Sequence, residues 1–281
     1  MKIGIVGAGT MGNGIAHVFA LYGYSVQLCD VNKTILTSAY DTICANMKRQ
    51  QSKGIIDENK IQQSIDRLQF TTSISDLKEC NLIVEAIKED YKIKANLFSN
   101  LDQICGKNTI LASNTSSISI SKLAENVSFP ERFIGMHFMN PVPIMKLIEI
   151  IKGKMTSKST LGTIKKLSIA IEKIPVECND SPGFVSNRIL MPMINEAAYC
   201  YMEKVGDAES IDSIMKLGMG HPMGPLKLAD LIGIDVCVYI LNVLFEGFND
   251  KKYKPCPLLV KMVSDNKLGK KTQEGFYKYG F

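Results

Sequence analysis

The chain has 281 residues, enough for two domains, and 46% of them are hydrophobic and 22% charged, as in ordinary soluble globular proteins. No uninterrupted apolar stretch approaches the roughly 18 residues that a membrane-spanning helix needs, and the net charge of +5 includes no basic tail, so neither a membrane protein nor a nucleic-acid-binding protein is indicated. The eight cysteines form no CxxC pair and no His/Cys cluster with metal spacing, so we expect no metal site and reduced thiols in a cytoplasmic protein.

The first predicted elements form a dinucleotide-binding pattern. A short apolar run at residues 3–6 predicts a buried strand, which starts too close to Met1 to leave room for a signal peptide. A predicted helix follows, and the turn between strand and helix has glycines in GxGxxG spacing. Such glycines permit a tight turn, close approach of a pyrophosphate and close packing of the helix, whose N-terminus attracts phosphate. We expect the cofactor to contact Gly7, Ala8, Gly9, Thr10, Met11 and Gly12.

The second apolar run, at residues 24–29, leads into an acid, Asp30, which lies 18 residues beyond Gly12. A carboxylate at this place accepts hydrogen bonds from the hydroxyls of the adenine ribose. The alternative is that Asp30 only caps the next helix. Because a carboxylate repels the additional 2′-phosphate of NADP, Asp30 favours NAD, with NADP as the alternative cofactor.

Two helices are predicted next, at about residues 32–53 and 57–68, and they make an insertion larger than a minimal βαβ unit contains. Three basic residues, Lys48, Arg49 and Lys53, gather on the first of these helices. Such a cluster is usually a solvated helix face, and the alternative is an anion site for a phosphate-bearing substrate. Composition alone favours the solvated face.

Apolar runs continue to alternate with helical segments through residue 177. Five further runs predict strands at residues 82–87, 109–113, 133–138, 146–151 and 174–177. This alternation predicts an α/β fold with a Rossmann-type, doubly wound, mostly parallel sheet. Polar residues at the carboxyl ends of parallel strands line the ligand crevice of such sheets. The residues in this position are Ser116, Ser117, His137 and Asn140.

A break at residues 181–183 divides the chain. Beyond it the pattern is helical, with helices predicted at about residues 184–204, 207–217, 224–247 and 256–265. We therefore predict a dinucleotide-binding α/β domain over residues 1–183 and a smaller all-helical domain over residues 184–281.

Three histidines are candidates for proton transfer. His17 lies in the first predicted helix and His221 precedes a Pro-rich turn, so both are expected to be structural. His137 closes a predicted strand, and Glu149 follows 12 residues later across a turn that contains two prolines. A strand–turn–strand path can bring this carboxylate back beside the imidazole, where it fixes the tautomer and stabilises the imidazolium. Such a pair is the general acid/base that oxidation of an alcohol needs.

At these residues the sequence resembles the L-3-hydroxyacyl-CoA dehydrogenase family. Five motifs carry the resemblance, which covers essentially the whole chain, and they lie at residues 7–12, 113–117, 135–143, 181–188 and 221–225. The resemblance implies interconversion of (S)-3-hydroxybutyryl-CoA, or another short-chain 3-hydroxyacyl-CoA, with the 3-ketoacyl-CoA by hydride transfer with NAD. It also implies a homodimer or larger homo-oligomer, in which the helical domain contributes to substrate binding and to the dimer interface.

The resemblance further implies a role for individual residues. His137 is the acid/base and Glu149 its partner, while Ser116 and Asn187 hydrogen-bond around the reacting oxygen and the nicotinamide, in a cleft between the domains. The residues that match NAD contacts, besides the glycine-rich turn and Asp30, are Glu89, Lys94, Ser116 and Asn140. The residues that match substrate contacts are Arg49, Lys53, Ser116 and Asn187. Because two of them belong to the basic cluster, the resemblance favours a CoA-phosphate site there over a solvated helix face.

Two other functions remain open from the sequence. A protein of the same fold could oxidise a free hydroxy acid or a sugar acid, although the basic cluster favours a CoA thioester. The chain could also be a catalytically silent, crystallin-like NAD-binding protein. The complete set of Ser116, His137, Glu149 and Asn187 argues against that alternative.

Overall fold

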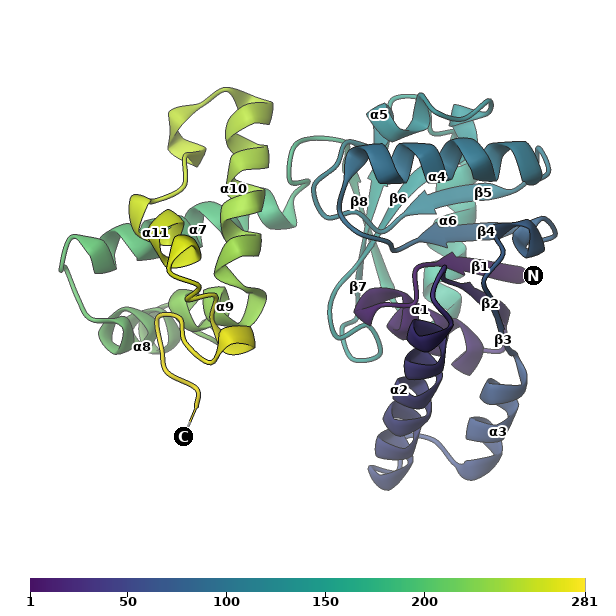
Figure 1. Ribbon diagram of the computed structural model, residues 1–281, viewed down its shortest axis with the longest axis horizontal. Helices are drawn as coiled ribbons and strands as arrows, with labels where there is room; N and C mark the ends of the chain where they lie inside the picture. The colour runs from purple at the N-terminus through teal and green to yellow at the C-terminus, as the bar shows by residue number, and fades with distance from the viewer. Residues whose placement is uncertain (281) are drawn as a thin grey trace. The chain divides into compact units, whose positions relative to one another are not determined.

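The computed structural model describes residues 1–280 and divides the chain into two compact units, Met1–Asp180 and Ser181–Phe281 (Figure 1). Phe281, the last residue of the predicted helical domain, lies outside the described residues. The division follows Asp180, whereas the predicted boundary follows Gly183.

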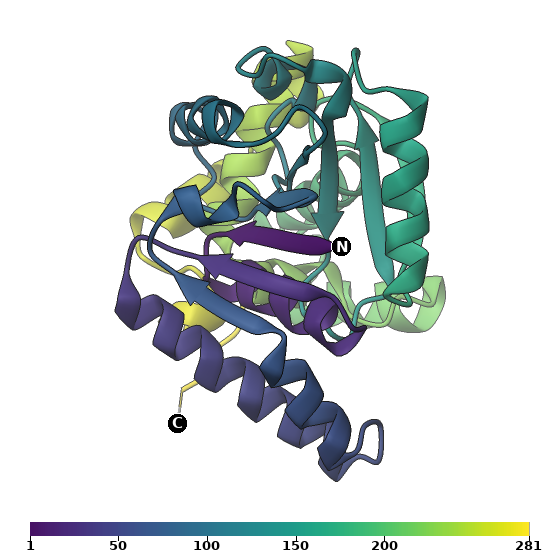
Figure 2. The same cartoon turned by 90° about the vertical axis from the view of Figure 1, so that its right-hand side faces the viewer.

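The first unit is built on a sheet that has eight strands within the described residues, in the order β3-β2-β1-β4-β5-β6-β7-β8 (Figure 2). Neighbouring strands are parallel except for β6 and β7, which are antiparallel. The predicted doubly wound, mostly parallel α/β fold is therefore confirmed. The strands are β1 (Lys2–Val6), β2 (Ser25–Cys29), β3 (Leu68–Thr71), β4 (Leu82–Glu85), β5 (Ile110–Ser113), β6 (Phe133–Phe138), β7 (Leu147–Lys152) and β8 (Ile174–Asn179).

Helices cover both faces of this sheet. On one face, Ile15, Met47 and Ile164 are fully buried in one apolar cluster with residues of the central strands. On the other face, the ring of Phe98 packs edge-on against Phe133 of β6, with ring centroids 4.6 Å apart. The helices of this unit are α1 (Thr10–Leu21), α2 (Lys33–Ser52), α3 (Glu58–Asp66), α4 (Tyr91–Ile104), α5 (Ile120–Ala124) and α6 (Lys158–Ala170).

The structure corrects the predicted end of one helix. The helix expected to run to Leu68 is α3, which ends at Asp66, and Leu68–Thr71 instead forms β3, paired with β2. A strand of four residues is too short for its alternation to be distinguished from the end of the preceding helix. What makes it a strand is its pairing with β2, which sequence spacing does not reveal.

The turn between β1 and α1 has the shape that a dinucleotide-binding motif requires. A Cβ atom on Gly12 would lie 1.7 Å from the carbonyl oxygen of Gly7, so helix and strand could not pack this closely with any side chain there. Nothing lies within 4 Å of the Cβ position of Gly9, which leaves the backbone open to a ligand. The turn therefore fits a pyrophosphate at the N-terminus of α1.

His17 of α1 is fully buried, in keeping with a structural role. Its Nε2 lies 3.0 Å from the side-chain oxygen of Gln50 on α2, and its Nδ1 has no hydrogen-bond partner among the described residues. Burial lowers the pKa of His17 to about 4; the Gln50 hydrogen bond opposes this shift and the charge of Lys173 adds to it. The imidazole is therefore neutral in the folded protein at pH 6, where an unfolded chain would bind a proton.

This difference predicts an acid sensitivity of the first unit. Because the folded pKa of His17 is depressed, its contribution to stability is complete above pH 6.5 and is lost as the pH falls towards 4. We expect His17 to account for about 2 kcal/mol of the fall in the free energy of unfolding between pH 7 and pH 5. Urea unfolding of the wild type and of His17→Gln at pH 7 and pH 5 measures how much of the fall in the free energy of unfolding depends on His17. Equal pH dependence in the two proteins would contradict the prediction.

The second unit is helical in the residues that the structure describes. Its core is formed by apolar side chains of α7, α9, α10 and α11. The single helix predicted over 224–247 is wrong: Gly233, with a φ of +105°, separates α9 from α10, and the two helices are bent by 98°. The helices are α7 (Ser186–Met202), α8 (Ala208–Met219), α9 (Pro225–Ile232), α10 (Ile234–Phe248) and α11 (Pro257–Ser264).

Two buried aspartates organise the end of this unit. Asp212 of α8 accepts a hydrogen bond from the N–H of Leu226, in the first turn of α9. Asp230 of α9 accepts hydrogen bonds from the N–H groups of Phe276 and Tyr277. Burial raises the pKa of Asp230, although these N–H donors oppose the shift. Through these contacts the segment after α11 is fixed to α9.

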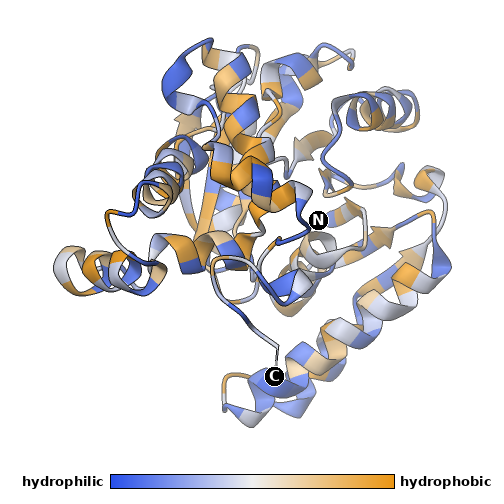
Figure 3. Ribbon diagram, turned by 60° about the vertical axis from the view of Figure 1, so that its left-hand side comes forward, coloured by the Kyte–Doolittle hydropathy of each residue, from blue (hydrophilic) through white to orange (hydrophobic). Residues whose placement is uncertain are grey.

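Hydrophobic residues are distributed unevenly along the helices (Figure 3). On α2 four residues are buried, Leu36, Ala39, Ile43 and Met47, and their spacing of three or four residues puts them on one face of the helix. Within residues 1–280, no single helix is long and apolar enough to span a membrane, and the bent pair α9–α10 reaches that composition only when both helices are counted together.

Candidate active site

His137 and Glu149 face each other on the antiparallel strands β6 and β7. The strand register pairs the two residues, and the Nδ1 of His137 lies 2.9 Å from the Oε2 of Glu149. Both residues are buried, with 6% and 4% of their surface exposed. Because a carboxylate only accepts hydrogen bonds, Nδ1 carries the proton and Nε2 is the basic nitrogen of the neutral imidazole. The structure thus brings together the pair expected from the sequence.

The other ring nitrogen of His137 meets Ser116. This serine lies in the turn after β5, and its Oγ is 3.0 Å from the Nε2 of His137. The imidazole is therefore held from both sides, by Glu149 and by Ser116. An alcohol oxygen bound between the Ser116 hydroxyl and Nε2 could transfer its proton to the imidazole, and the carboxylate would stabilise the resulting cation.

Two further residues support this pair and were not identified from the sequence. The side-chain oxygen of Asn114 accepts a hydrogen bond of 2.8 Å from the N–H of Phe138, which ties the turn after β5 to the end of β6. The thiol of Cys178, on β8, donates to the Oε1 of Glu149 at 3.8 Å. Asn114 lies in the motif at residues 113–117, but no role was predicted for it. Nothing in the sequence indicated Cys178, because its contact depends on the pairing of β7 with β8.

Asp30 lies at the carboxyl end of β2, beside the glycine-rich turn. Its carboxylate accepts hydrogen bonds from the N–H of Ala8 at 2.9 Å and from the N–H of Asn32 at 3.1 Å. The residue that caps α2 is Asn32, whose side chain accepts from the N–H of Thr34, so Asp30 does not have the capping role considered as the alternative. The carboxylate lies where the adenine ribose binds in sheets of this kind.

A pocket of about 660 Å³ connects the glycine-rich turn with the loop after β6. Gly9 and Thr10 line it from the turn, Ser38 from α2 and Asn140 from the loop. Its volume is within the range of roughly 300–1,000 Å³ that small-molecule sites occupy. The open backbone at Gly9, the N-terminus of α1 and the neighbouring carboxylate of Asp30 together fit a nicotinamide dinucleotide.

A second pocket of about 690 Å³, over α2, is lined by several basic residues. Arg49 and Lys53 line it, as expected for an anion site, and Lys60 and Lys146 join them. Lys48, the third member of the predicted cluster, is exposed and is not among the lining residues. The two pockets share Asn46, Pro141 and Pro143. Cationic groups beside an apolar wall suit a ligand that has both phosphates and an organic body.

The loop after β6, which lines both pockets, is held by Lys173. The ammonium of Lys173 donates to the carbonyl oxygens of Val142 at 2.6 Å and Met145 at 2.7 Å. Burial lowers the pKa of Lys173 to about 8, and the charge of Lys146 adds to the shift. Lys173, which directly precedes β8, therefore fixes the backbone of the loop that contains Asn140 through two hydrogen bonds.

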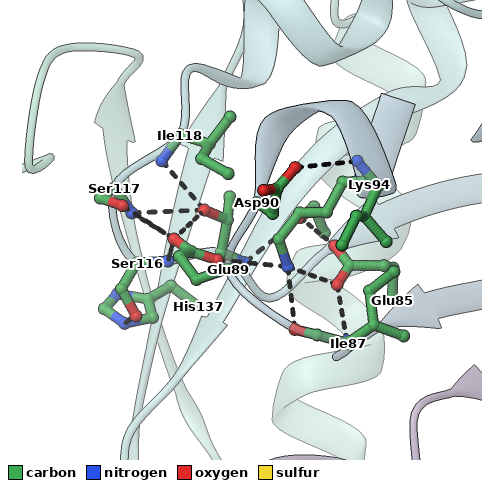
Figure 4. A network of polar contacts seen from close by, with 12 residues as sticks. Glu85, Ile87, Glu89, Asp90, Lys94, Ser116, Ser117, Ile118 and His137 are labelled. Atoms are coloured by element: carbon green, nitrogen blue, oxygen red, sulfur yellow. Dashed lines mark hydrogen bonds and ion pairs between the residues drawn. The ribbon is translucent and has the colours of Figure 1, made fainter. Parts of the chain in front are cut away.

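Glu89 and Lys94, both expected to contact NAD, belong to a buried polar network (Figure 4). The Lys94 Nζ lies 2.5 Å from Glu85 and 3.2 Å from Glu89, and its side chain is 1% exposed. Burial raises the pKa of Glu85. Burial also opposes ionisation of Glu89, but Lys94 and the hydroxyl donors outweigh it, so the pKa of Glu89 is lowered. Glu85 was missed, although a carboxylate inside the apolar run at 82–87 was a signal.

Asn187 belongs to the second unit, in the first turn of α7. Asn187 is buried, with 8% of its surface exposed, and its backbone N–H donates a hydrogen bond to the carbonyl oxygen of Gly183. Its place around the reacting oxygen remains a prediction from the family resemblance.

Comparisons with known proteins cover nearly the whole chain. Residues 2–181 match the family described as 3-hydroxyacyl-CoA dehydrogenase, NAD binding domain, and residues 183–279 match 3-hydroxyacyl-CoA dehydrogenase, C-terminal domain. A probable 3-hydroxybutyryl-CoA dehydrogenase from Deinococcus radiodurans is 50% identical, over 99% of this chain and 100% of the relative. A 3-hydroxybutyryl-CoA dehydrogenase from Bradyrhizobium diazoefficiens is 49% identical, over 99% of this chain and 95% of the relative. The crystal structure of (S)-3-hydroxybutyryl-CoA dehydrogenase from Ralstonia eutropha has a TM-score of 0.97 at 44% identity, over 100% of this chain and 99% of that one.

Proposed function

The chain belongs to the 3-hydroxyacyl-CoA dehydrogenase family, and from this premise we propose how its own residues carry out the reaction. The protein is an NAD-dependent oxidoreductase that interconverts (S)-3-hydroxybutyryl-CoA and acetoacetyl-CoA. Bound NAD supplies the acceptor for the hydride that leaves C3 of the substrate. The chain must therefore bind both molecules, remove the proton of the 3-hydroxyl group and stabilise the charge that results.

We assign the proton transfer to His137. Its Nε2 takes the proton of the 3-hydroxyl group as the C3–H bond breaks, and it returns a proton to the keto oxygen in the reverse direction. Glu149, 2.9 Å from Nδ1, holds the proton on Nδ1 and stabilises the positive charge that the imidazole gains during the reaction. Ser116 donates its hydroxyl hydrogen to the reacting oxygen, and Asn187 is proposed to do the same from α7. The observation that carries this proposal is the imidazole held between Glu149 and Ser116.

The proposed cofactor contacts follow the pocket beside α1. The turn from Gly7 to Gly12 binds the pyrophosphate, and Asp30 accepts hydrogen bonds from the ribose hydroxyls, which favours NAD over NADP. Asn140 lines the same pocket, and Glu89 and Ser116 lie at the carboxyl end of the neighbouring strands. These residues are proposed as NAD contacts.

The function is tested by following nicotinamide absorbance with acetoacetyl-CoA and, separately, with free acetoacetate. NADH oxidation with the thioester and little with the free acid is the expected result. Equal rates on the two substrates would favour a dehydrogenase of free hydroxy acids, and no oxidation of either would favour a silent NAD-binding protein. NADPH run in parallel tests Asp30, since faster oxidation of NADPH than of NADH would contradict its proposed role.

The pocket lined by Arg49 and Lys53 is proposed to bind the phosphates of CoA. We expect Arg49→Met with Lys53→Met to raise KM for acetoacetyl-CoA about 10-fold and to leave kcat nearly unchanged, because the phosphates are far from the reacting carbon and are bound equally in the ground and transition states. Steady-state kinetics at saturating NADH measures both constants. Lys48→Met is the matched control, because Lys48 lies on the same helix outside the pocket and should keep the wild-type KM. A lower kcat with an unchanged KM would contradict the assignment.

We also propose a homodimer formed through the second unit. Ile214 and Leu217, which are 63% and 87% exposed, lie three residues apart on α8, and a second copy of the chain could cover them. Sedimentation of the full chain would test this. We propose the cytoplasm as the location, because the eight cysteines include no CxxC pair and four of them are buried, which suits a compartment that keeps thiols reduced.

A further inference from the structure

Lys94 and Glu85 form an ion pair deep in the first unit, between the start of α4 and the end of β4 (Figure 4). Their side chains are 1% and 0% exposed, and the Lys94 Nζ lies 2.5 Å from the Glu85 Oε1. Glu85 also accepts hydrogen bonds from the N–H of Ile87 at 2.7 Å and from the hydroxyl of Ser113 at 2.6 Å. Because desolvation largely offsets the attraction of a buried ion pair, such a pair contributes little net stability. Its location therefore requires another explanation.

Lys94 also contacts Glu89, which in turn holds the turn at residues 115–117. The Lys94 Nζ is 3.2 Å from the Glu89 Oε2. The other carboxylate oxygen, Oε1, accepts from the Thr115 hydroxyl at 2.6 Å and the Ser116 N–H at 3.0 Å. It also accepts from the N–H and the hydroxyl of Ser117, at 3.1 and 2.8 Å. An ionised carboxylate is the acceptor that such a convergence of donors needs.

This turn leads directly to the acid/base pair. It carries Ser116, whose Oγ lies 3.0 Å from the Nε2 of His137. If the turn moved, the hydroxyl would leave both the imidazole and the position of the reacting oxygen. Misplacement of a reacting or positioning group by about 1 Å can cost about 100-fold in rate. The geometry at His137 thus depends on Glu89 remaining in place.

Glu89 and Glu85 contact the same ammonium group, so the charge of Lys94 separates two carboxylates. Without this cation the two like charges could not both remain ionised in so buried a site. Glu85 is fully buried and bonded to the backbone, whereas the side chain of Glu89 is 29% exposed. Glu89 is therefore the carboxylate that can turn away from the ammonium site towards solvent, and such a movement removes acceptors from the turn.

We propose that Lys94, together with Glu85, is a positioning residue that keeps Glu89 on its turn and thereby sets Ser116 against His137. This differs from the direct NAD contact expected for Lys94 from the sequence. The ammonium is 1% exposed and is already bonded to two carboxylates and to a backbone carbonyl oxygen. The inference rests on the proposed acid/base role of His137.

The test is a double-mutant cycle between Lys94→Met and Ser116→Ala, with kcat measured on acetoacetyl-CoA at saturating NADH. Alone, Lys94→Met is expected to lower kcat at saturating NADH about 10- to 100-fold. Because Glu89 and Ser116 are also proposed NAD contacts, the Kd for NADH, measured by fluorescence titration, is expected to rise by a smaller factor than kcat falls. In the Ser116→Ala background the same substitution should lower kcat less than about 3-fold, because the hydroxyl that it positions is already absent. Lys92→Met, exposed on the same helix, is the matched control and should keep the wild-type kcat.

If Lys94→Met does not fold, the double substitution Glu85→Gln with Lys94→Met takes its place in the cycle, because it leaves no unpaired carboxylate at Glu85. A raised Kd for NADH with an unchanged kcat would overturn the proposal in favour of direct cofactor contact. An equal fall of kcat in both backgrounds would also overturn it, since Lys94 would then act independently of Ser116. A wild-type protein inactive on acetoacetyl-CoA would contradict the proposed function instead, so the two failures are distinguishable.

Discussion

His137→Gln is expected to lower kcat about 10²- to 10⁴-fold in both directions of the reaction, the range that general acid/base catalysis contributes. Glutamine has a similar size and can still donate to the buried carboxylate of Glu149, but its amide cannot take up the proton of the 3-hydroxyl group. NADH oxidation with acetoacetyl-CoA, and NAD reduction with (S)-3-hydroxybutyryl-CoA, measure the loss.

The control for this prediction is cofactor binding. The pocket beside α1 is lined by the glycine-rich turn, α2 and the loop after β6, and His137 is not among its lining residues. The Kd of His137→Gln for NADH should therefore equal that of the wild type. Wild-type turnover in this variant would exclude His137 as the acid/base.

Glu149→Gln is expected to lower kcat about 10²- to 10³-fold with an unchanged Kd for NADH. The amide can hydrogen-bond to Nδ1 through its oxygen, yet it carries no charge to stabilise the imidazolium, and the rotated amide would favour the wrong tautomer of His137. Steady-state kinetics and NADH fluorescence separate the two constants. Because the carboxylate is 4% exposed, its effect on the imidazole is weakly screened by salt.

Glu177→Gln is the matched control for this substitution. Glu177 lies on β8, the strand next to β7, but its side chain is exposed and paired with Lys165 at 2.6 Å. Removal of its charge should leave kcat within about 2-fold of the wild type, since exposed ion pairs contribute little. Equal losses in Glu149→Gln and Glu177→Gln would indicate a general effect on the sheet rather than on His137.

Local spacing was enough to predict part of the site. His137 and Glu149 lie on neighbouring strands joined by one short connection, so the separation of 12 residues already indicated that they could meet. The glycine-rich turn was likewise predictable, because strand, turn and helix are consecutive in the chain. Features of this kind depend on the geometry of one supersecondary element, which the sequence pattern describes well.

Other parts of the site depend on contacts between distant segments. Glu89 meets the turn that carries Ser116, 27 residues away, only because β4 and β5 are neighbours in the sheet. Lys146 and Arg49 line one pocket although nearly a hundred residues separate them. The spacing of residues in the sequence could not show that Lys94 is buried against Glu85. Its predicted role as an NAD contact therefore came from the family resemblance alone.

The fold corrections have the same cause. Leu68–Thr71 is a strand because it pairs with β2, and the sequence of these four residues alone does not indicate that pairing. The bend at Gly233 was missed because the apolar spacing continues on both sides of it, and a glycine inside a helical pattern is often tolerated. Only the packing of α9 and α10 into one core settles where the first helix ends.

The antiparallel pairing of β6 and β7 has a consequence for how activity is lost on heating. These strands lie inside the sheet, flanked by β5 and β8, so their amide hydrogens should be among the slowest in the first unit to exchange with deuterium. The spacing of His137 and Glu149 is set by this hydrogen-bonded ladder rather than by a mobile loop. The pair should therefore survive local fluctuations, and thermal inactivation should coincide with cooperative melting of the whole unit instead of preceding it.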